Sequence, residues 1–382
     1  MRFTDEQRML RDVARDFART RLAPFAAERD RESQFPAEAV AELGKLGFMG
    51  MLVPEAYGGA GADHVGYALV MEEIAAGEGA VSTMLSVQNS VGCMPVLQYG
   101  SEEQKRRFLE PMAKGEMLAC FCLTEPQAGS DAAAIKTRAR RRGNRWVLSG
   151  TKQFITSGKH AQIAIVFAVT DPERGKKGIS AFLVPTDSPG FRVAGLEHKL
   201  GQRASDTAQL VFEEVELTPD LMLGAEGEGY RIALANLEGG RIGVGAQSVG
   251  MARAAYEAAL AYAREREAFG KLIIEQQAVA FRLADMATQI AAARGLVLDA
   301  AARRDAGEPC IKEASMAKLF ASEMAERVAS DAIQIHGGYG YVAGFPVERI
   351  WRDVRVCQIY EGTSDIQRLV IAREIAREIA KD

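Results

Sequence analysis

The chain has 382 residues, of which 48% are hydrophobic and 26% charged, and its mean hydropathy is −0.09. Forty-seven basic and 51 acidic residues give a formal net charge of −4, which argues against a nucleic-acid-binding protein, because such a protein carries a basic face or stripe. No apolar run approaches the ~18 residues that span a bilayer, and hydropathy this ordinary argues against a disordered chain. The composition therefore predicts a soluble, globular protein with two or three domains.

The cysteines and the four histidines show no metal-ligand spacing, so no metal site is predicted. An odd number of cysteines without a disulfide framework predicts reduced thiols; they are Cys93, Cys120, Cys122, Cys310 and Cys357. Cys120 and Cys122 could form a redox or metal pair, but residues two apart point the same way on a strand, which favours buried structural thiols. Acidic residues are interleaved with the arginines near the N-terminus, unlike in a transit peptide, so we expect a cytoplasmic protein.

Residues 1–118 have the pattern of a helical domain. Apolar residues recur at helical spacing from Met9 to Phe17 and again within residues 38–46 and 67–74. Capping boxes mark the start of two helices: Thr4 with Gln7, and Ser101 with Gln104.

Residues 119–226 change to short runs of β-branched and aromatic residues between turn signals. The runs are residues 145–148, 154–156, 163–170, 179–184 and 210–217. Short strands at this spacing predict a small antiparallel sheet or barrel, and we expect a middle antiparallel β-barrel domain.

Residues 227–382 are strongly helical again. The long, alanine-rich segments are residues 230–264, 274–306, 311–335 and 365–380. Because a helix of ~30 residues is ~45 Å long, these elements predict an antiparallel four-helix bundle. The expected architecture is therefore multi-domain α and β, with an N-terminal all-α domain, the β-barrel and a C-terminal four-helix bundle.

Gly338, Gly340 and Ala343 match the G-x-G-x-x-A dinucleotide pattern. That motif functions between a strand and a helix, whereas this copy follows a long helical stretch and precedes Pro346. A nicotinamide-type Rossmann site is therefore not predicted.

A second motif, residues 122–131, lies at the seam between the first two domains. Pro126 and Gly129 favour an irregular loop with exposed backbone N–H groups, and Thr124 and Ser130 add hydroxyls. Such a loop could hold a planar polar heterocycle or a phosphate. A domain-linking turn with an Asx-type bond from Asp131 is the simpler interpretation, and the residues alone favour it slightly.

A third motif places Glu361 just ahead of a predicted capping box, Ser364 with Gln367, which would begin the last helix. The helix N-terminus offers free N–H groups and partial positive charge to an oxyanion that develops beside a catalytic Glu361. Acids near helix N-termini are also common and mildly stabilising, so both interpretations stay open at this point.

Four motifs in the same order resemble those of the acyl-CoA dehydrogenase family. They are Leu-Thr-Glu-Pro-x-Ala-Gly-Ser-Asp at 123–131, Arg-Glu-Ala-Phe-Gly at 266–270, Gln-Ile-His-Gly-Gly-Tyr-Gly at 334–340 and Ile-Tyr-Glu-Gly-Thr-Ser-Asp-Ile-Gln-Arg at 359–368. The resemblance covers essentially the whole chain, and the helical, β, helical order is also that of the family. Within it, the sequence is most similar to the short-chain (butyryl-type) and short branched-chain members.

The resemblance implies an FAD site between the β domain and the bundle. It places at the flavin Phe121, Leu123, Thr124, Ser130, Phe154, Thr156, Thr363 and Asp365. It places at the FAD of a neighbouring subunit Arg266, Phe269, Gln276, Gln277, Gln334, Gly337 and Gly338. A shared cofactor implies at least a dimer, and the usual assembly in the family is a homotetramer, a dimer of dimers.

The implied reaction converts an acyl-CoA to the trans-2-enoyl-CoA. Glu361 would remove the α-proton while a hydride passes from the β-carbon to flavin N5, and the Glu361 N–H and a ribityl hydroxyl would hold the thioester oxygen. Substrate contacts are implied for Ser130, Glu238, Arg241 and Gly362, and the electrons would leave to an electron-transfer flavoprotein. Some members carry the base on the first long bundle helix; here that position is Gly240, so the base is assigned to the loop.

Two positions depart from the family pattern. Phe154 stands where many members have tryptophan, and Gly344 replaces a usually acidic or amide residue. An oxidase or flavin monooxygenase on the same fold is the alternative, although such enzymes often lack the loop glutamate; a non-catalytic scaffold that retains FAD is a third class. Butyryl, isobutyryl, 2-methylbutyryl and cyclic or aromatic acyl groups stay open, since one methylene changes pocket affinity by only about 1 kcal/mol.

Overall fold

The computed structural model describes residues 2–380, except for the side chain of Glu238. The first part of the chain is helical, as predicted, and both of its capping boxes form: Thr4 and Ser101 each accept the backbone N–H three residues further on. Its helices are α1 (Asp5–Phe17), α2 (Ala26–Glu32), α3 (Ala37–Lys45), α4 (His64–Gly77), α5 (Gly79–Val87), α6 (Met94–Tyr99), α7 (Glu102–Gln104) and α8 (Glu110–Ala113). Helix α4 is buried on nearly every side, because it packs on α1, α9 and α10.

An eight-stranded sheet follows, in the order β6-β7-β3-β2-β4-β5-β8, with β1 also paired to β4. The strands are β1 (Ala119–Cys122), β2 (Arg138–Arg142), β3 (Arg145–Thr156), β4 (Ile163–Val169), β5 (Ile179–Pro185), β6 (Phe191–Leu196), β7 (Thr207–Leu217) and β8 (Met222–Leu223). The pairing is mainly antiparallel, as predicted, but β1 and one end of β2 run parallel to β4. Arginine-rich β2 and largely exposed β6 were missed, because neither shows a run of buried apolar residues.

The predicted runs 145–148 and 154–156 are two parts of the single long strand β3. The spacing of Cys120 and Cys122 is confirmed as a strand pattern, since both thiols are buried on β1 with their sulfur atoms 3.7 Å apart. They belong to the packed core.

The third part of the chain contains α9 (Gly229–Ala263), α10 (Gln277–Asp305), α11 (Ile311–His336), α12 (Pro346–Val354) and α13 (Ser364–Ile379). The four predicted long helices begin and end within three residues of the bounds of α9, α10, α11 and α13. The short α12 was not predicted. Helices α9, α10 and α11 pack on one another, and α13 packs against α11. A two-stranded hairpin, β9 (Glu267–Ala268) and β10 (Lys271–Leu272), connects α9 to α10.

Gly338 and Gly340 of the G-x-G-x-x-A segment lie in a short 3-10 helix, η10 (Gly337–Tyr341), between α11 and α12, and Ala343 lies in the turn that follows it. The segment follows a helix, as the sequence predicted, and therefore lacks the strand–turn–helix setting of a dinucleotide-binding loop.

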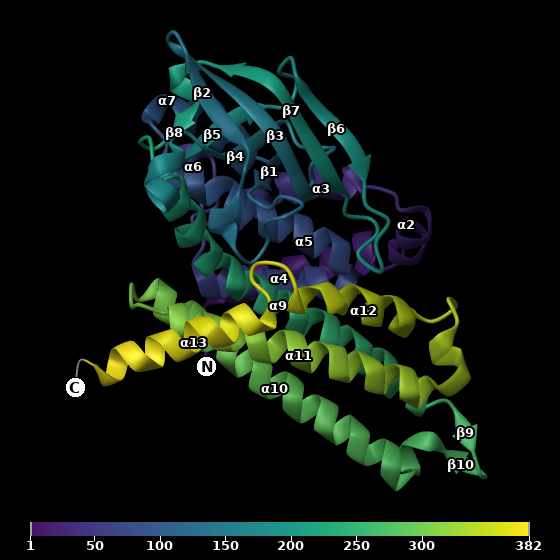
Figure 1. Cartoon of the computed structure of the whole chain (residues 1–382). Coiled ribbons are helices and arrows are strands. Elements are labelled where there is room, and N and C mark those ends of the chain that lie inside the picture. Colours follow the sequence, from purple (N-terminus) through teal and green to yellow (C-terminus); the bar gives the residue numbers. More distant parts are fainter. Residues whose placement is uncertain (1, 381–382) are drawn as a thin grey trace.

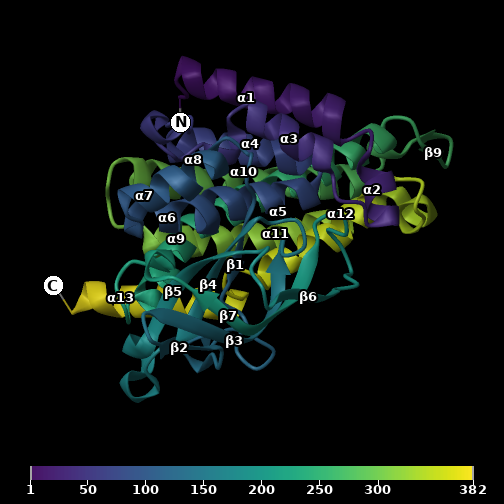
Figure 2. The same cartoon turned by 90° about the horizontal axis from the view of Figure 1, so that it is seen from above.

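The three parts share one apolar core, which includes Leu69 of α4, Phe167 of β4 and Ile242 of α9. In Figure 1 the sheet lies above the long helices, and the segment between α12 and α13 rises from the bundle toward it. Figure 2, seen from above, shows the N-terminal helices on one side of the view and the sheet on the other. No helix within residues 2–380 is long and apolar enough to cross a membrane.

Candidate active site

Two adjoining cavities open where the sheet, α5, α9 and the segment after α12 meet. One has a volume of 650 Å³ and extends between the loop after β1, residues 199–207 and residues 352–363. The other, of 380 Å³, extends along α5, α9 and α13. The residues that line both are Thr83, Thr124, Gly129, Ser130, Phe154, Thr156, Tyr360, Glu361 and Gly362. Glu361 therefore lies where the two cavities meet.

The backbone at Glu361 makes an unusual turn. Glu361 has a φ of +50° and Gly362 a φ of +92°, both in the left-handed region, and such a conformation costs a non-glycine residue on the order of 1 kcal/mol. The turn presses the carboxylate against α9, because a Cβ added to Gly240 would lie only 1.9 Å from Glu361 Oε2. The carboxylate of Glu361 can therefore occupy this position only because residue 240 of α9 has no side chain.

The carboxylate of Glu361 is in an environment suited to a general base. Its Oε2 atom is buried and has no hydrogen-bond partner among the described residues. Burial raises the pKa of Glu361 to about 7, although the nearby charges of Lys318 and Arg241 lower it. A carboxyl group that is half ionised at neutral pH can take up a proton from a substrate and release it again.

The start of α13 corrects one prediction. The N-cap is Thr363, whose side chain accepts the N–H of Ile366, and Ser364 is already inside the helix. Gln367 does not reach back to the cap; its buried amide donates to Glu361 O at 3.2 Å and to Gly362 O at 3.0 Å. The predicted capping box of Ser364 with Gln367 is wrong, because the side-chain amide of Gln367 donates to the carbonyls of the left-handed turn instead.

A buried ion pair holds the loop after β1. Lys152 of β3 donates to Leu123 O at 3.1 Å and to Glu125 Oε1 at 2.8 Å. Burial alone would raise the pKa of Glu125, but the charge of Lys152 and hydrogen bonds from Thr137 and Lys136 lower it to about 2. The predicted Asx-type bond also forms, from Ala133 N–H to Asp131 at 3.3 Å, so this loop both links two domains and lines the cavities.

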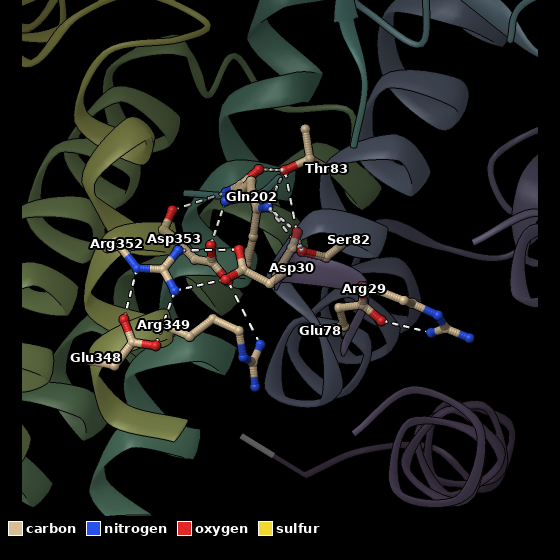
Figure 3. A network of polar contacts seen from close by, with 12 residues as sticks. Arg29, Asp30, Glu78, Ser82, Thr83, Gln202, Glu348, Arg349, Arg352 and Asp353 are labelled. Atoms are coloured by element: carbon tan, nitrogen blue, oxygen red, sulfur yellow. Dashed lines mark hydrogen bonds and ion pairs between the residues drawn. The ribbon is translucent and has the colours of Figure 1, made fainter. Parts of the chain in front are cut away.

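A polar network beneath the larger cavity joins all three parts of the chain (Figure 3). Gln202 makes three of its bonds. Its backbone N–H donates to the Asp353 carboxylate, and its side-chain N–H donates to Asp353 O at 3.0 Å. The side-chain oxygen of Gln202 accepts from the Thr83 hydroxyl. Burial raises the pKa of Asp353 to about 6. Arg352 binds Asp30, with N–O distances of 2.7 and 3.1 Å. The network fixes α12, and with it the start of the segment that carries Glu361.

In the structure the predicted cofactor and substrate residues fall into three groups. The cavities around Glu361 are lined by Phe121, Leu123, Thr124, Ser130, Phe154, Thr156, Arg241, Gly362 and Thr363. A third cavity, of 440 Å³, contains Arg266, Gly337 and Gly338, and shares none of its described lining residues with the first two. The hairpin before α10 lies at the far end of the bundle in Figure 1, and there the side chain of Phe269 is 98% exposed.

Five further predicted residues are not among the described lining residues of these cavities. Gln276 and Gln277 begin α10, and Gln334 lies in the last turn of α11. Asp365 is exposed at the start of α13, where it pairs with Arg368 at 3.3 Å. Glu238 belongs to α9, and its side chain lies outside the described residues.

Comparison with known proteins shows the relationship of the whole chain. Family models described as the N-terminal, middle and C-terminal domains of acyl-CoA dehydrogenase match residues 4–116, 120–215 and 227–376. An acyl-CoA dehydrogenase of Bacillus subtilis (strain 168) is 49% identical over 98% of this chain and 98% of its own length. The chain belongs to the acyl-CoA dehydrogenase family.

Two further similarities extend this result. The mitochondrial short-chain specific acyl-CoA dehydrogenase of Homo sapiens is 48% identical over 98% of this chain and 90% of its own. The solved structure of butyryl-CoA dehydrogenase from Megasphaera elsdenii has a TM-score of 0.96 at 42% identity, over 98% of this chain and 99% of that one. The protein is thus an acyl-CoA dehydrogenase, and its relatives support the short-chain type.

Members of the acyl-CoA dehydrogenase family are FAD-dependent flavoproteins. The residues around the larger cavity fit an isoalloxazine ring, which is planar, apolar on its faces and polar at its edge. Phe154 projects a ring that is 61% exposed from a backbone with a φ of +58°, and Thr124 and Thr156 bring hydroxyls to the same cavity.

Several residues of the site were missed by sequence reasoning, namely Thr83, Gln202, Gln247, Lys318 and the inward-facing Gln367. A signal existed for Lys318, because it interrupts the buried stripe of Ala314, Ala317, Ala321 and Ala325 on α11. A charged residue in the middle of an apolar helical stripe is buried for a reason. The others are polar residues whose spacing carries no comparable signal.

Proposed function

We propose that this acyl-CoA dehydrogenase uses FAD and that Glu361 is the base that removes the α-proton of a short-chain acyl-CoA. The observation that carries the proposal is the buried carboxylate at the junction of the two cavities, with a pKa raised to about 7. The junction is where the reacting carbons of a thioester must lie if the flavin occupies one cavity and the acyl chain the other.

The chemistry follows from the weak acidity of a hydrogen beside a thioester. Glu361 takes up the α-proton, and its own backbone N–H is available to hold the thioester oxygen, on which negative charge develops. FAD would accept the hydride from the β-carbon, so that two hydrogens leave and a trans-2-enoyl-CoA remains. Apolar side chains at the cavity, such as Val244 and Leu237, exclude water and keep the carboxyl basic. Two electrons must leave after each turnover, and we infer an electron-transfer flavoprotein as their acceptor.

We assign the flavin ring to the larger cavity, where Thr124, Ser130, Phe154, Thr156 and Thr363 would contact it. We also propose as FAD contacts Phe121 and Leu123, which line the adjoining smaller cavity, and Asp365 at the start of α13. We further propose that Arg266, Phe269, Gln276, Gln277, Gln334, Gly337 and Gly338 contact the FAD of a neighbouring subunit. The separate cavity that contains Arg266, Gly337 and Gly338, and the exposure of Phe269, support a site completed by a second copy, in a homotetramer. The division into domains at residues 118/119 and 226/227, and a location in the cytoplasm, stay predictions.

We assign acyl-CoA contacts to Ser130, Glu238, Arg241 and Gly362, and a short acyl chain to the smaller cavity. A hydrogen-bonded group borders this cavity: Gln247 donates to Thr83 Oγ1 at 2.6 Å and accepts from the Tyr360 hydroxyl. Opening this group for a long chain would leave buried polar atoms unpaired, at about 1–3 kcal/mol each. The network therefore favours butyryl-sized substrates, with short branched chains as the next candidates.

An anaerobic titration of the FAD-containing protein with acyl-CoAs tests the proposal. We expect butyryl-CoA to bleach the flavin absorbance quickly, and palmitoyl-CoA to bleach it slowly or not at all. Glu361→Gln should still bind FAD and acyl-CoA but reduce the flavin at a vanishing rate. A near-native rate in this variant would refute the base assignment, and rapid oxygen uptake with butyryl-CoA would instead support the oxidase alternative.

A further inference from the structure

Helix α11 carries a lysine, Lys318, whose side chain is fully buried beneath the turn of Glu361. Within the part of the chain that the structure describes, its ammonium group makes one hydrogen bond, to Gly362 O at 2.7 Å, and no ion pair. A buried cation without a carboxylate partner is unfavourable unless its surroundings compensate. The proposed reaction assigns Lys318 no role.

The carbonyl that Lys318 contacts belongs to the left-handed turn. Gly362 O also accepts the amide of Gln367 at 3.0 Å, and the same amide contacts Glu361 O at 3.2 Å. Two buried side chains therefore hold the backbone of two consecutive residues with positive φ. One of the two donors is charged and the other is neutral, which allows their contributions to be separated.

Titratable groups on four neighbouring elements interact with Lys318 or Glu361. They are Glu323 of α11, Arg241 of α9, Cys357 of the 3-10 helix before the turn, and Tyr67 of α4. Burial raises the pKa of Cys357 and of Tyr67, so both are neutral at working pH. Glu323 is hydrogen-bonded to Arg368. Lys318 and Arg241 are therefore the cations that act on Glu361.

Lys318 is bonded to the turn itself. Burial lowers the pKa of Lys318 to about 8, while the charge of Glu361 is among those that raise it. The Lys318 side chain is thus mostly protonated near neutral pH, where Glu361 ionises. A cation that is bonded to the residue after the base, and that stays charged when the base is charged, stabilises the ionised form of the base.

We propose that Lys318 is a positioning residue for the base, whose ammonium group holds the Glu361–Gly362 turn against α9 and stabilises the ionised carboxylate. The inference rests on the proposed function, because Lys318 acts through Glu361. It goes beyond that function because it gives the buried Lys318 of α11 a role, which is to stabilise the ionised form of Glu361.

The test compares the FAD-containing native protein with Lys318→Met, Lys318→Arg and Gln367→Leu, by anaerobic stopped-flow reduction with butyryl-CoA from pH 5.5 to 9. In Lys318→Met we expect the rate at pH 7 to fall at least about tenfold and the apparent pKa of the base to rise by about 1–3 units. Lys318→Arg keeps the charge and should keep the pKa within about half a unit. Gln367→Leu removes a neutral donor from the same carbonyl, so it should slow the reaction without raising the pKa.

The inference is overturned if Lys318→Met keeps the native rate and pKa, or if it loses FAD and thermal stability while the pKa stays unchanged. It is also overturned if Gln367→Leu raises the pKa as much as Lys318→Met. Should Lys318→Met fail to fold, Lys318→Gln replaces it, and a native pKa in that variant has the same meaning. An active Glu361→Gln would refute the proposed function itself, whereas an inactive Glu361→Gln beside a native-like Lys318→Met refutes only the role of Lys318.

Discussion

A methyl group added to Gly240 of α9 would collide with the carboxylate of Glu361. An alanine Cβ there would lie 1.9 Å from Oε2, so the oxygen must move by about 1.5 Å to reach ordinary contact distance. The atom that yields is the end of a side chain, and alanine improves a helix interior by about 1 kcal/mol over glycine. We therefore expect Gly240→Ala to fold and to bind FAD with undiminished stability.

The expected loss is in the chemistry. A misplacement of about 1 Å in a catalytic group costs on the order of 10²-fold in rate, so Gly240→Ala should reduce its flavin with butyryl-CoA about 100-fold more slowly or worse. Gly295→Ala in α10 is the matched control, because its added Cβ would meet nothing within 4 Å. Stopped-flow absorbance measures the rate, and thermal unfolding and FAD content measure integrity. A native rate in Gly240→Ala would refute the geometry, and so would a variant that fails to fold.

Three further results are expected. The rate of flavin reduction at limiting substrate should rise about tenfold per pH unit below an apparent pKa of about 7 and level off above it, because only ionised Glu361 accepts a proton; a profile that is flat from pH 5.5 to 9 would contradict this. Lys152→Met leaves Glu125 buried without its cation and should lower the free energy of unfolding in urea by about 3–5 kcal/mol, whereas a loss below about 1 kcal/mol would show that the pair is not needed. The pKa of Glu125 is lowered from 4.5 to about 2, so its ionised form contributes about 3 kcal/mol of stability above pH 4.5, which is lost as the pH falls toward 2; acid titrations of the native protein and of Glu125→Gln should therefore differ in slope, and parallel curves would count against the shift.

The course of the chain was largely predictable from local patterns. Alanine-rich helical stripes, β-branched runs and the capping boxes at Thr4 and Ser101 are short-range signals, and the structure confirms the helical, β, helical order that they indicate. Strands without buried alternation, such as β2 and β6, were missed because they are stabilised by their neighbours in the sheet rather than by a pattern of their own.

Part of the site was also visible in the sequence, since the motif that contains Glu361 and the loop that contains Thr124 both line the cavities. The Ser364–Gln367 capping box failed for an instructive reason. Local spacing allowed Gln367 to cap its helix. The carbonyls of Glu361 and Gly362, which precede the helix, instead accept the hydrogen bonds of its buried amide. Competition between a local and a tertiary partner is invisible in a linear pattern.

By itself, the sequence determined which residue types stand at each motif. Those residue types were enough to indicate the family and the kind of chemistry. Only the tertiary structure decided that Gly240 leaves room for the carboxylate of Glu361, and that Lys318 is bonded to the same turn. It also decided that Arg266 lines a separate cavity and that the hairpin with Phe269 lies at the far end of the bundle. The physical reason is that a pKa and a base's position depend on burial and on contacts between segments distant in sequence. Such contacts exist only once α9, α11 and the segment before α13 have packed together.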